Sequence, residues 1–345
     1  MIPVFLRSTF ASHSFYWGTK TIMTIHNLKF QGVWDMQCFV YHTNLPSYMF
    51  TPDKLEFKKD ANMLKGGLVY ADYITTVSET YAEEIKTPYY GEQLDGLLCA
   101  RSRSLRGILN GIDYDIYNPE TDPKISVHYN VSNVVEQKKQ AKRNLQAELG
   151  LPVDDSKFMI AIISRLTDQK GLDLVDWIAD RITDEFTQFV IIGTGESRYE
   201  NMFRYYQGKY PDRVSANIFY SDPLAHKLYA AADAMLVPSR FEPCGLTQLI
   251  SLRYGTVPIV RETGGLKDTV EPYNEYDKVG TGFTFRHYNA DDLLYTINYA
   301  KKIYFDFRDD WNEIITRGMQ KDFSWKSSAR QYEGMYDWIL RGMKD

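Results

Sequence analysis

The sequence has few cysteines, no long apolar run and no secretory signal, and each shortage excludes a class of protein. The three cysteines, Cys38, Cys99 and Cys244, lie too far apart for a CxxC metal pair and argue against a disulfide scaffold. No apolar stretch approaches the length that spans a bilayer, and residues 1–7 lack a charged start and a cleavage site. We therefore expect a soluble, cytoplasmic protein without a membrane partner.

The sequence also lacks a large excess of positive or negative charge, and its histidines show no metal-binding pattern. Forty basic and forty-five acidic residues leave a formal net charge of −5, which predicts no nucleic-acid partner. The six histidines show neither HxxxH nor HExxH spacing, so no metal site is predicted. What is present is 345 residues with 44% hydrophobic side chains, enough for roughly two domains with large cores.

Short β-rich runs alternate with longer helical patterns, which is typical of parallel βαβ units. Strands are predicted at residues 21–25, 73–77, 158–163, 189–192, 234–237 and 257–260. Helices are predicted at residues 136–149, 172–183, 197–207, 224–231, 245–254 and 324–340. We interpret the basic residues Lys138, Lys139, Lys142 and Arg143 as a solvent-exposed helix face. The pattern as a whole predicts an α/β fold.

Turn residues concentrate between periodic segments at 110–123, and we place the domain joint there. The predicted division is a first Rossmann-like domain at 1–115, a second at 116–322 and a C-terminal helix at 323–345. That last helix has one apolar face, which must pack on another part of the protein. We expect it to return to the first domain.

The run PSRFEPCGLTQ at residues 238–248 is the most informative stretch of the chain. It places Glu242 between a predicted strand and a predicted helix, at the carboxyl end of the strand, where open α/β sheets bind ligands. The free N–H groups of the following helix turn favour an anion such as a phosphate. The sequence therefore predicts a ligand site around Glu242.

Arg165 and Lys170 occupy a similar position after the predicted strand 158–163. The planar fork of an arginine and the mobile charge of a lysine can together bind a diphosphate and stabilise its charge as it leaves. The alternative is an exposed loop whose charges are incidental. Both interpretations stay open from these residues alone.

Three further features are ambiguous. His26 ends the predicted strand 21–25, where a histidine is either a hydrogen-bonded structural residue or a catalytic one. Tyr220 is either a core tyrosine or an aromatic that stacks on a base. Gly193 and Gly195 resemble the start of a dinucleotide fingerprint, but Arg198 occupies the third glycine position, which disfavours an NAD-dependent oxidoreductase.

Taken together, the motifs resemble those of bacterial glycogen synthases and plant starch synthases. These are retaining glucosyltransferases with the GT-B fold, in which two Rossmann-like domains enclose a cleft. The resemblance runs in order through almost the whole chain. Its motifs are TIHN (24–27), FQG (30–32), KGGL (65–68), TTVS (75–78), ILNGID (108–113), SRLT (164–167), QKG (169–171), VPSRFEPCGLTQ (237–248) and TGGLKDTV (263–270).

The resemblance implies a role for each matching residue. Arg165 and Lys170 would hold the donor diphosphate, and Glu242 would bind the transferred glucose. His26 and Asn110 would line the glucosyl site, while Tyr220 would stack on adenine. The diphosphate would also be supported by the backbone of Cys244, Gly245, Leu246 and Thr247. No metal cofactor is implied, because the two cations supply the charge.

Two departures from related patterns refine this expectation. GT-B relatives with two glutamates have the second one eight residues after the first, where this chain has Ile250, which favours the synthase branch. A single carboxylate suits a same-face attack in which the diphosphate assists proton removal, whereas retaining hydrolases use a pair. The family's N-terminal KxGGL donor loop and DWH segment do not occur in the sequence, so the resemblance implies an N-terminally truncated chain with an incomplete first domain.

The function implied is transfer of glucose from ADP-glucose to the non-reducing end of an α-1,4-glucan, with retention of configuration. The partners implied are ADP-glucose, ADP and a glucan such as glycogen. Two alternatives stay open. One is a GT-B enzyme that uses a UDP-sugar, and the other is an inactive fragment that binds nucleotide or glucan.

Overall fold

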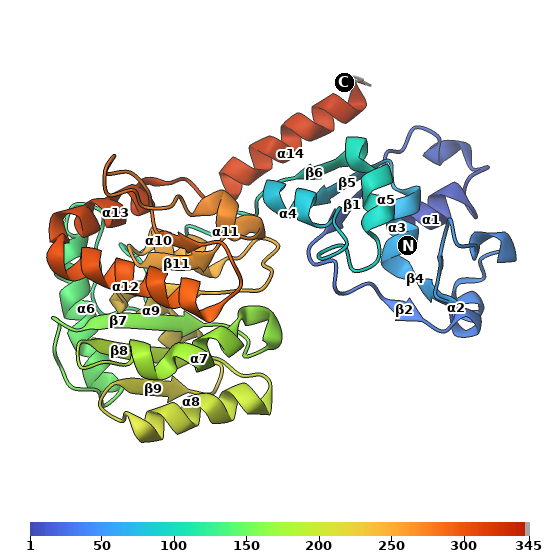
Figure 1. Ribbon diagram of the computed structural model, residues 1–345. Coiled ribbons are helices and arrows are strands. Elements are labelled where there is room, and N and C mark those ends of the chain that lie inside the picture. Colours follow the sequence, from blue (N-terminus) through green and yellow to red (C-terminus); the bar gives the residue numbers. More distant parts are fainter. Residues whose placement is uncertain (342–345) are drawn as a thin grey trace. The chain divides into compact units, whose positions relative to one another are not determined.

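The computed structural model describes residues 1–341 and divides the chain into two units, each with its own parallel sheet (Figure 1). The smaller unit comprises Met1–Leu109 and the chain from Arg330 on, and the larger one comprises Asn110–Ala329. Within the described residues, no helix combines the length and the apolar character needed to cross a membrane.

The larger unit is built on a six-stranded parallel sheet with the order β12-β11-β10-β7-β8-β9. Its strands are β7 (Phe158–Ile163), β8 (Thr187–Ile192), β9 (Val214–Asn217), β10 (Ala234–Val237), β11 (Val257–Arg261) and β12 (Phe283–Phe285). The chain moves outward from β7 to β9, then crosses back to β10 and continues in the other direction. The order therefore reverses between β7 and β10, which is the switch point of a Rossmann-type sheet.

Helices cover both faces of this sheet, as its strands require. β7, β8, β10 and β11 are rich in apolar residues and nearly all of their side chains are buried, so neither face is exposed to water. In Figure 1, α7, α8 and α12 lie on one face, and α6 and α9 lie on the other. The helices are α6 (Val134–Glu148), α7 (Leu172–Ile182), α8 (Ser197–Lys209), α9 (Asp222–Ala231), α10 (Thr247–Arg253), α11 (Gly264–Thr269), α12 (Ala290–Asp306) and α13 (Arg308–Gln320).

The smaller unit contains a three-stranded parallel sheet and a small antiparallel one. The parallel strands, in the order β1-β5-β6, are β1 (Ile22–Ile25), β5 (Tyr73–Thr76) and β6 (Leu105–Gly107). The antiparallel strands, in the order β2-β4-β3, are β2 (Val33–Trp34), β4 (Asp60–Asn62) and β3 (Glu56–Phe57). The helices are α1 (Ile2–Arg7), α2 (Met36–Thr43), α3 (Met63–Tyr70), α4 (Glu79–Glu84) and α5 (Asp95–Ala100), together with the part of α14 (Trp325–Leu340) that follows Ala329.

The second half of α14 packs within the smaller unit. Met335 and Ile339 are buried in one apolar cluster with Ile108. The ring of Trp338 meets the edge of Tyr73, with the two ring centroids 5.1 Å apart. The chain therefore leaves the smaller unit after β6, forms the whole larger unit and then returns to the smaller one.

The predicted solvent-exposed face of basic residues on α6 is wrong for two of its lysines. Lys138 and Lys142 are only 5% and 2% exposed. The Lys142 ammonium donates to the Asp233 carboxylate at 2.5 Å and to the Tyr304 hydroxyl at 3.0 Å. Both lysines share the inward side of α6 with apolar residues three positions away, which are Ala141 for Lys138 and Leu145 for Lys142. Because the two lysines interrupt the apolar pattern on the inward side of α6, the sequence did not show that this side is buried.

Lys138 joins the ends of two helices. Its ammonium nitrogen donates to the Ala230 carbonyl at 2.9 Å, near the end of α9, and to the Tyr254 carbonyl at 3.3 Å, at the end of α10. It also donates to the Thr256 hydroxyl at 2.7 Å. These hydrogen bonds reach the ends of both helices, so this one side chain links α9 to α10.

Lys138 gives a prediction on the pH dependence of stability. Burial lowers its pKa to about 7, whereas a lysine in the unfolded chain titrates near ~10.4. Between these values the unfolded state binds more protons, so this site adds stability as the pH rises. We expect the difference in unfolding free energy between the wild type and Lys138→Met to grow by up to ~1.4 kcal/mol per pH unit from about pH 7 to 9.

Urea denaturation at several pH values measures this difference. Lys139→Met is the matched control, because Lys139 lies one position along α6 and pairs with Glu136 at the surface. A difference that stays flat or shrinks as the pH rises would show that Lys138 keeps its proton in the folded protein.

Candidate functional site

The site in the larger unit is defined by the reversal of strand order. β7 and β10 are neighbours, with Ala234 paired to Ile160, so the loops after both strands start at the same sheet edge. Arg165 and Lys170 lie in the loop after β7, and Glu242 lies in the loop after β10. The three charged residues predicted for the site thus come from the two loops that flank the switch point.

Glu242 and Lys170 form an ion pair. The Lys170 ammonium lies 2.6 Å from Glu242 Oε2, and the two side chains are 18% and 10% exposed. The Ser239 hydroxyl donates to the same oxygen at 2.8 Å. The sequence predicted that both charged groups face a ligand crevice, but not that they bind each other. The carboxylate is therefore held in place by two hydrogen bonds, one from a charged ammonium group and one from an uncharged hydroxyl group.

The loop that carries Glu242 is fixed by main-chain contacts on two sides. Gly171 has a φ of +70°, and a Cβ there would lie 2.0 Å from the Pro238 carbonyl oxygen. Gly264 has a φ of +44°, and a Cβ there would lie 2.0 Å from the Glu242 carbonyl oxygen. Any other residue would push the loop away at either point. The two glycines therefore allow neighbouring segments to touch the backbone around Glu242.

The predicted helix at 245–254 begins later than expected. α10 starts at Thr247, because Gly245 has a φ of +73° and cannot continue a helix. Leu246 precedes the helix and is 47% exposed. Cys244 is buried, and burial raises the pKa of its thiol to about 12, while a hydrogen bond to the Asn110 backbone acts in the opposite direction. The structure thus brings Asn110 and Cys244 together and keeps the thiol neutral.

Arg165 and Tyr220 line one cavity of about 200 Å³. It lies beside the loops after β7 and β8 and the segment that leads into α9, and Ile163, Gly193 and Phe219 also contribute to it. Tyr220 is 86% exposed, so the alternative of a core tyrosine is wrong. A mainly apolar cavity with an arginine and an exposed tyrosine in its lining is suited to a base that carries a phosphate.

The glycines at 193 and 195 serve a close approach between loops. The Gly193 N–H donates to the Asn217 carbonyl, and Leu166 donates to the Thr194 carbonyl at 2.9 Å. Arg198, at the position where the dinucleotide fingerprint needs glycine, forms an ion pair with Asp168. The site therefore lacks the third close approach of an NAD-binding turn.

His26 belongs to the smaller unit. It directly follows β1 and is exposed, at the carboxyl edge of the three-stranded parallel sheet. The adjacent Asn27 accepts a hydrogen bond from the Lys29 N–H at 3.0 Å, which forms a tight turn after the strand.

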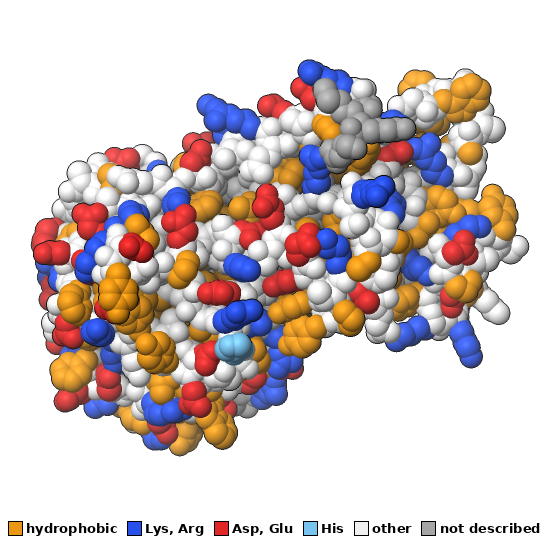
Figure 2. All heavy atoms as spheres, turned by 45° about the horizontal axis from the view of Figure 1, so that its top comes forward, with side chains coloured by type: hydrophobic (Ala, Val, Ile, Leu, Met, Phe, Trp, Pro, Cys, Tyr) orange, Lys and Arg blue, Asp and Glu red, His pale blue; other side chains and the backbone are white. Residues whose placement is uncertain are grey.

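The face of the molecule drawn in Figure 2 carries acidic and basic side chains interspersed. Within residues 1–341, no three His, Cys, Asp or Glu side chains are grouped as a metal site requires.

Sequence reasoning missed the contribution of Ser239. It lies in the run that was singled out, three residues before Glu242, but only the folded loop turns its hydroxyl back onto the carboxylate. The signal that the sequence offered for this contact was a serine three residues before a glutamate in the same loop.

Comparison with known proteins identifies the class. Residues 1–100 match the family described as the starch synthase catalytic domain, and residues 146–317 match the glycosyl transferases of group 1. With its two Rossmann-like sheets and its charged switch point, the protein is a glycosyltransferase of the GT-B fold. It is 63% identical to the glycogen synthase of Lachnospira eligens over 98% of this chain and 70% of that protein. The chain belongs to the glycogen synthase family.

Other relatives agree with this assignment. The glycogen synthase of Thermotoga maritima is 49% identical over 97% of this chain and 69% of its own length. The catalytic domain of starch synthase IV from Arabidopsis thaliana, solved with ADP and acarbose, is 31% identical with a TM-score of 0.88, over 98% of this chain and 71% of that one. Sucrose-phosphate synthase from Thermosynechococcus elongatus shares the fold, with 19% identity, a TM-score of 0.57 and coverage of 93% and 68%. The predicted family, fold and enzyme class are confirmed.

Proposed function

We propose that the protein transfers glucose from ADP-glucose to the non-reducing end of an α-1,4-glucan such as glycogen, with retention of configuration. The observation that carries this proposal is the Lys170–Glu242 ion pair at the switch point, in a chain of the glycogen synthase family. The structure of starch synthase IV with ADP and acarbose supports ADP as the nucleotide of the donor.

The donor would occupy the loops at the switch point. Its adenine enters the cavity beside Tyr220, and its diphosphate reaches Arg165 and Lys170. The N–H groups of Cys244 to Thr247, in the segment that leads into α10, give the diphosphate further donors. When the diphosphate takes Lys170 as a partner, Glu242 gains free acceptor capacity for glucose hydroxyls.

The chemistry follows from these placements. The bond between C1 of glucose and the diphosphate oxygen breaks, and C1 bonds to the O4 hydroxyl of the acceptor on the same face. The acceptor proton passes to the departing diphosphate, so ADP leaves with it. Arg165 and Lys170 stabilise the charge that develops on the diphosphate, and Glu242 orients the sugar.

Two further roles are proposals supported by the family motifs around them. His26 and Asn110 would each contact the transferred glucose, from the TIHN and ILNGID segments. A cytoplasmic location is proposed on the three thiols, all of which are free in the structure.

The test is incorporation of labelled glucose into glycogen from ADP-glucose, with UDP-glucose as the competing donor. We expect ADP-glucose to be used with a kcat/KM at least about tenfold higher, and the product to be sensitive to enzymes that cleave α-1,4 bonds. Faster transfer from UDP-glucose would favour the alternative GT-B enzyme. Binding of ADP without any transfer would favour an inactive fragment.

A further inference from the structure

Gln248 is a buried side chain of the larger unit to which the proposed transfer assigns no role. It is the second residue of α10 and is fully buried. Its amide nitrogen lies within hydrogen-bond distance of three oxygens, which are the Cys244 carbonyl at 3.0 Å, the Gly245 carbonyl at 2.9 Å and the Thr269 hydroxyl at 3.1 Å. The side chain therefore connects the segment after Glu242 to α11.

The chemistry of these three partners fixes the orientation of the amide. Two of them are backbone carbonyls, which only accept, and the Thr269 hydroxyl already donates its hydrogen to the Gly265 carbonyl at 2.6 Å. The group that faces them is therefore the NH₂ of the amide and not its oxygen. That oxygen, Oε1, has no hydrogen-bond donor within residues 1–341. A buried oxygen without a donor costs stability, and an apolar side chain of similar size would avoid this cost, so the role of Gln248 lies with its nitrogen.

The hydrogen bonds of this nitrogen orient two peptide groups. The Cys244 and Gly245 carbonyls both point toward the Gln248 amide. In a trans peptide, the C=O group and the N–H group of the next residue point in opposite directions. The N–H groups of Gly245 and Leu246 therefore point away from Gln248. In the part of the chain that the structure describes, neither of them donates to a protein acceptor.

The backbone conformation of this segment turns the two N–H groups to one side. Gly245 has a φ of +73°, whereas Leu246 has a φ of −110° and a ψ of −27°, so a left-handed residue is followed by a right-handed one. Successive residues of opposite hand form a concave surface of N–H groups that binds anions. A Cβ at Gly245 would lie 2.3 Å from Gln248 Oε1, so the buried amide and this conformation both require glycine at position 245.

We propose that Gln248 is a positioning residue for the donor, whose amide holds the N–H groups of Gly245 and Leu246 toward the diphosphate. The inference rests on the proposed function, in which the diphosphate of ADP-glucose lies against this segment. Without the amide, the two carbonyls lose their donor and the peptide groups are free to rotate, so the N–H groups are no longer fixed before the donor binds. The adenosine part of the donor binds beside Tyr220, where Gln248 has no contact.

Calorimetric titration of the full chain with ADP, and ligand-observed NMR titration with adenosine, measure the two parts of the donor separately. We expect Gln248→Met to raise the Kd for ADP by roughly tenfold or more, because the hydrogen bonds to the charged diphosphate lose their fixed donors. The Kd for adenosine, which has no phosphate, should stay within about twofold of the wild type. Gln146→Met is the matched control, since Gln146 is also fully buried and its amide donates to Gln188 Oε1 at 2.7 Å, near the start of β8. It should bind ADP like the wild type.

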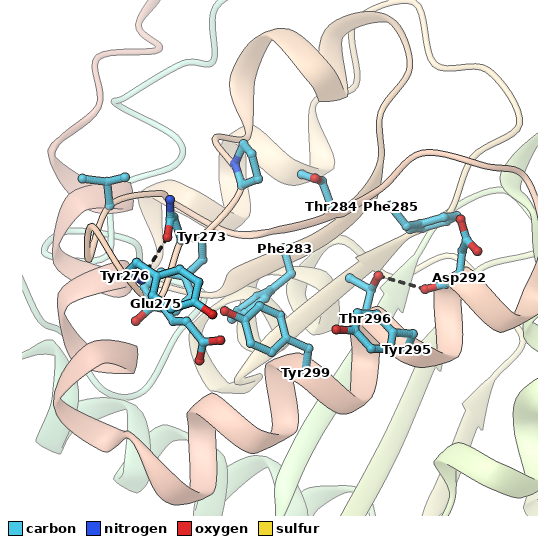
Figure 3. Close-up of a pocket in the computed structure, with 13 residues that line it drawn as sticks. Tyr273, Glu275, Tyr276, Phe283, Thr284, Phe285, Asp292, Tyr295, Thr296 and Tyr299 are labelled. Atoms are coloured by element: carbon cyan, nitrogen blue, oxygen red, sulfur yellow. Dashed lines mark hydrogen bonds between the residues drawn. The ribbon is translucent and has the colours of Figure 1, made fainter.

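Thr269→Val tests the same link by a smaller change. It removes the hydroxyl that accepts from Gln248 and leaves the glutamine in place, so we expect the Kd for ADP to rise by about threefold. Thr296→Val is the matched control, because Thr296 is buried too and its hydroxyl donates to the Asp292 carbonyl, four residues earlier on α12, at 2.8 Å (Figure 3). The Thr269 hydroxyl bonds to Gly265 in the same way within α11. The control should leave the Kd for ADP unchanged.

The outcomes separate this inference from the proposed function. If the wild type transfers glucose and Gln248→Met binds ADP as tightly as the wild type does, only the inference is overturned. Equal losses for ADP and adenosine would also overturn it, because the glutamine would then merely support the fold. A wild-type chain that binds no ADP would refute the proposed donor, and the inference with it. If Gln248→Met does not fold, Thr269→Val decides, and an unchanged Kd for ADP in that variant overturns the inference.

Discussion

Glu242→Gln should lower kcat for glucosyl transfer by about 10²- to 10³-fold, the loss typical when a preorganised polar group is removed from an active site. Glutamine keeps the shape of the side chain but removes the charge that holds the Lys170 ammonium and would accept glucose hydroxyls. Initial rates of label incorporation from ADP-glucose measure the effect. Thermal unfolding of the variant verifies that the loop still folds.

Asp180→Asn is the matched control for this prediction. Asp180 is a carboxylate paired to a lysine on another helix, since it lies 2.7 Å from Lys209. It lies in the last turn of α7 (Leu172–Ile182), at the opposite end of that helix from the loop after β7. Its variant should keep near-normal turnover. A Glu242→Gln enzyme with more than about a third of wild-type activity would show that the carboxylate has no part in transfer.

The second large effect is expected at Lys170. Lys170→Met should lower kcat/KM for ADP-glucose by about 10²- to 10³-fold, because it removes the ammonium that faces both the carboxylate and the proposed diphosphate. Arg165→Met should have a smaller effect, expressed mainly in KM, since Arg165 is exposed and lines the cavity proposed for the base of the donor. Steady-state kinetics with varied ADP-glucose distinguishes the two.

A double-mutant cycle tests whether Lys170 and Glu242 act as one unit. If they do, Lys170→Met combined with Glu242→Gln should lose little more than the worse single variant, as expected for groups in direct contact. Losses that multiply would indicate independent roles, and the ion pair would then be a feature of the donor-free enzyme only.

The strands of the larger unit were easier to predict from the sequence than the contacts between its side chains. Long apolar runs identified β7, β10 and β11, and the motif resemblance supplied the roles of the residues that follow them. β9 and β12 were missed because both are short and contain polar residues, as VSAN and FTF show, whereas the four residues of β10 are all apolar.

Contacts between distant residues were beyond the reach of sequence patterns. The Lys170–Glu242 pair joins residues 72 positions apart, and only the register of β7 beside β10 brings them together. The burial of Lys138 is similar, because its acceptors are carbonyl groups at two helix ends that the local sequence cannot specify. Local composition predicts the elements, whereas the pairing of polar groups depends on how the elements pack.

The contacts at Gly171 and Gly264 have a consequence for changing the enzyme's specificity. The backbone around Glu242 is held by contacts with the backbone at Gly171 and Gly264. Its path therefore does not depend on exposed neighbouring side chains such as Leu246. Such outer positions can be varied in a library that seeks other donors while the carboxylate stays where it is. The two glycines are the positions that any such library has to leave untouched.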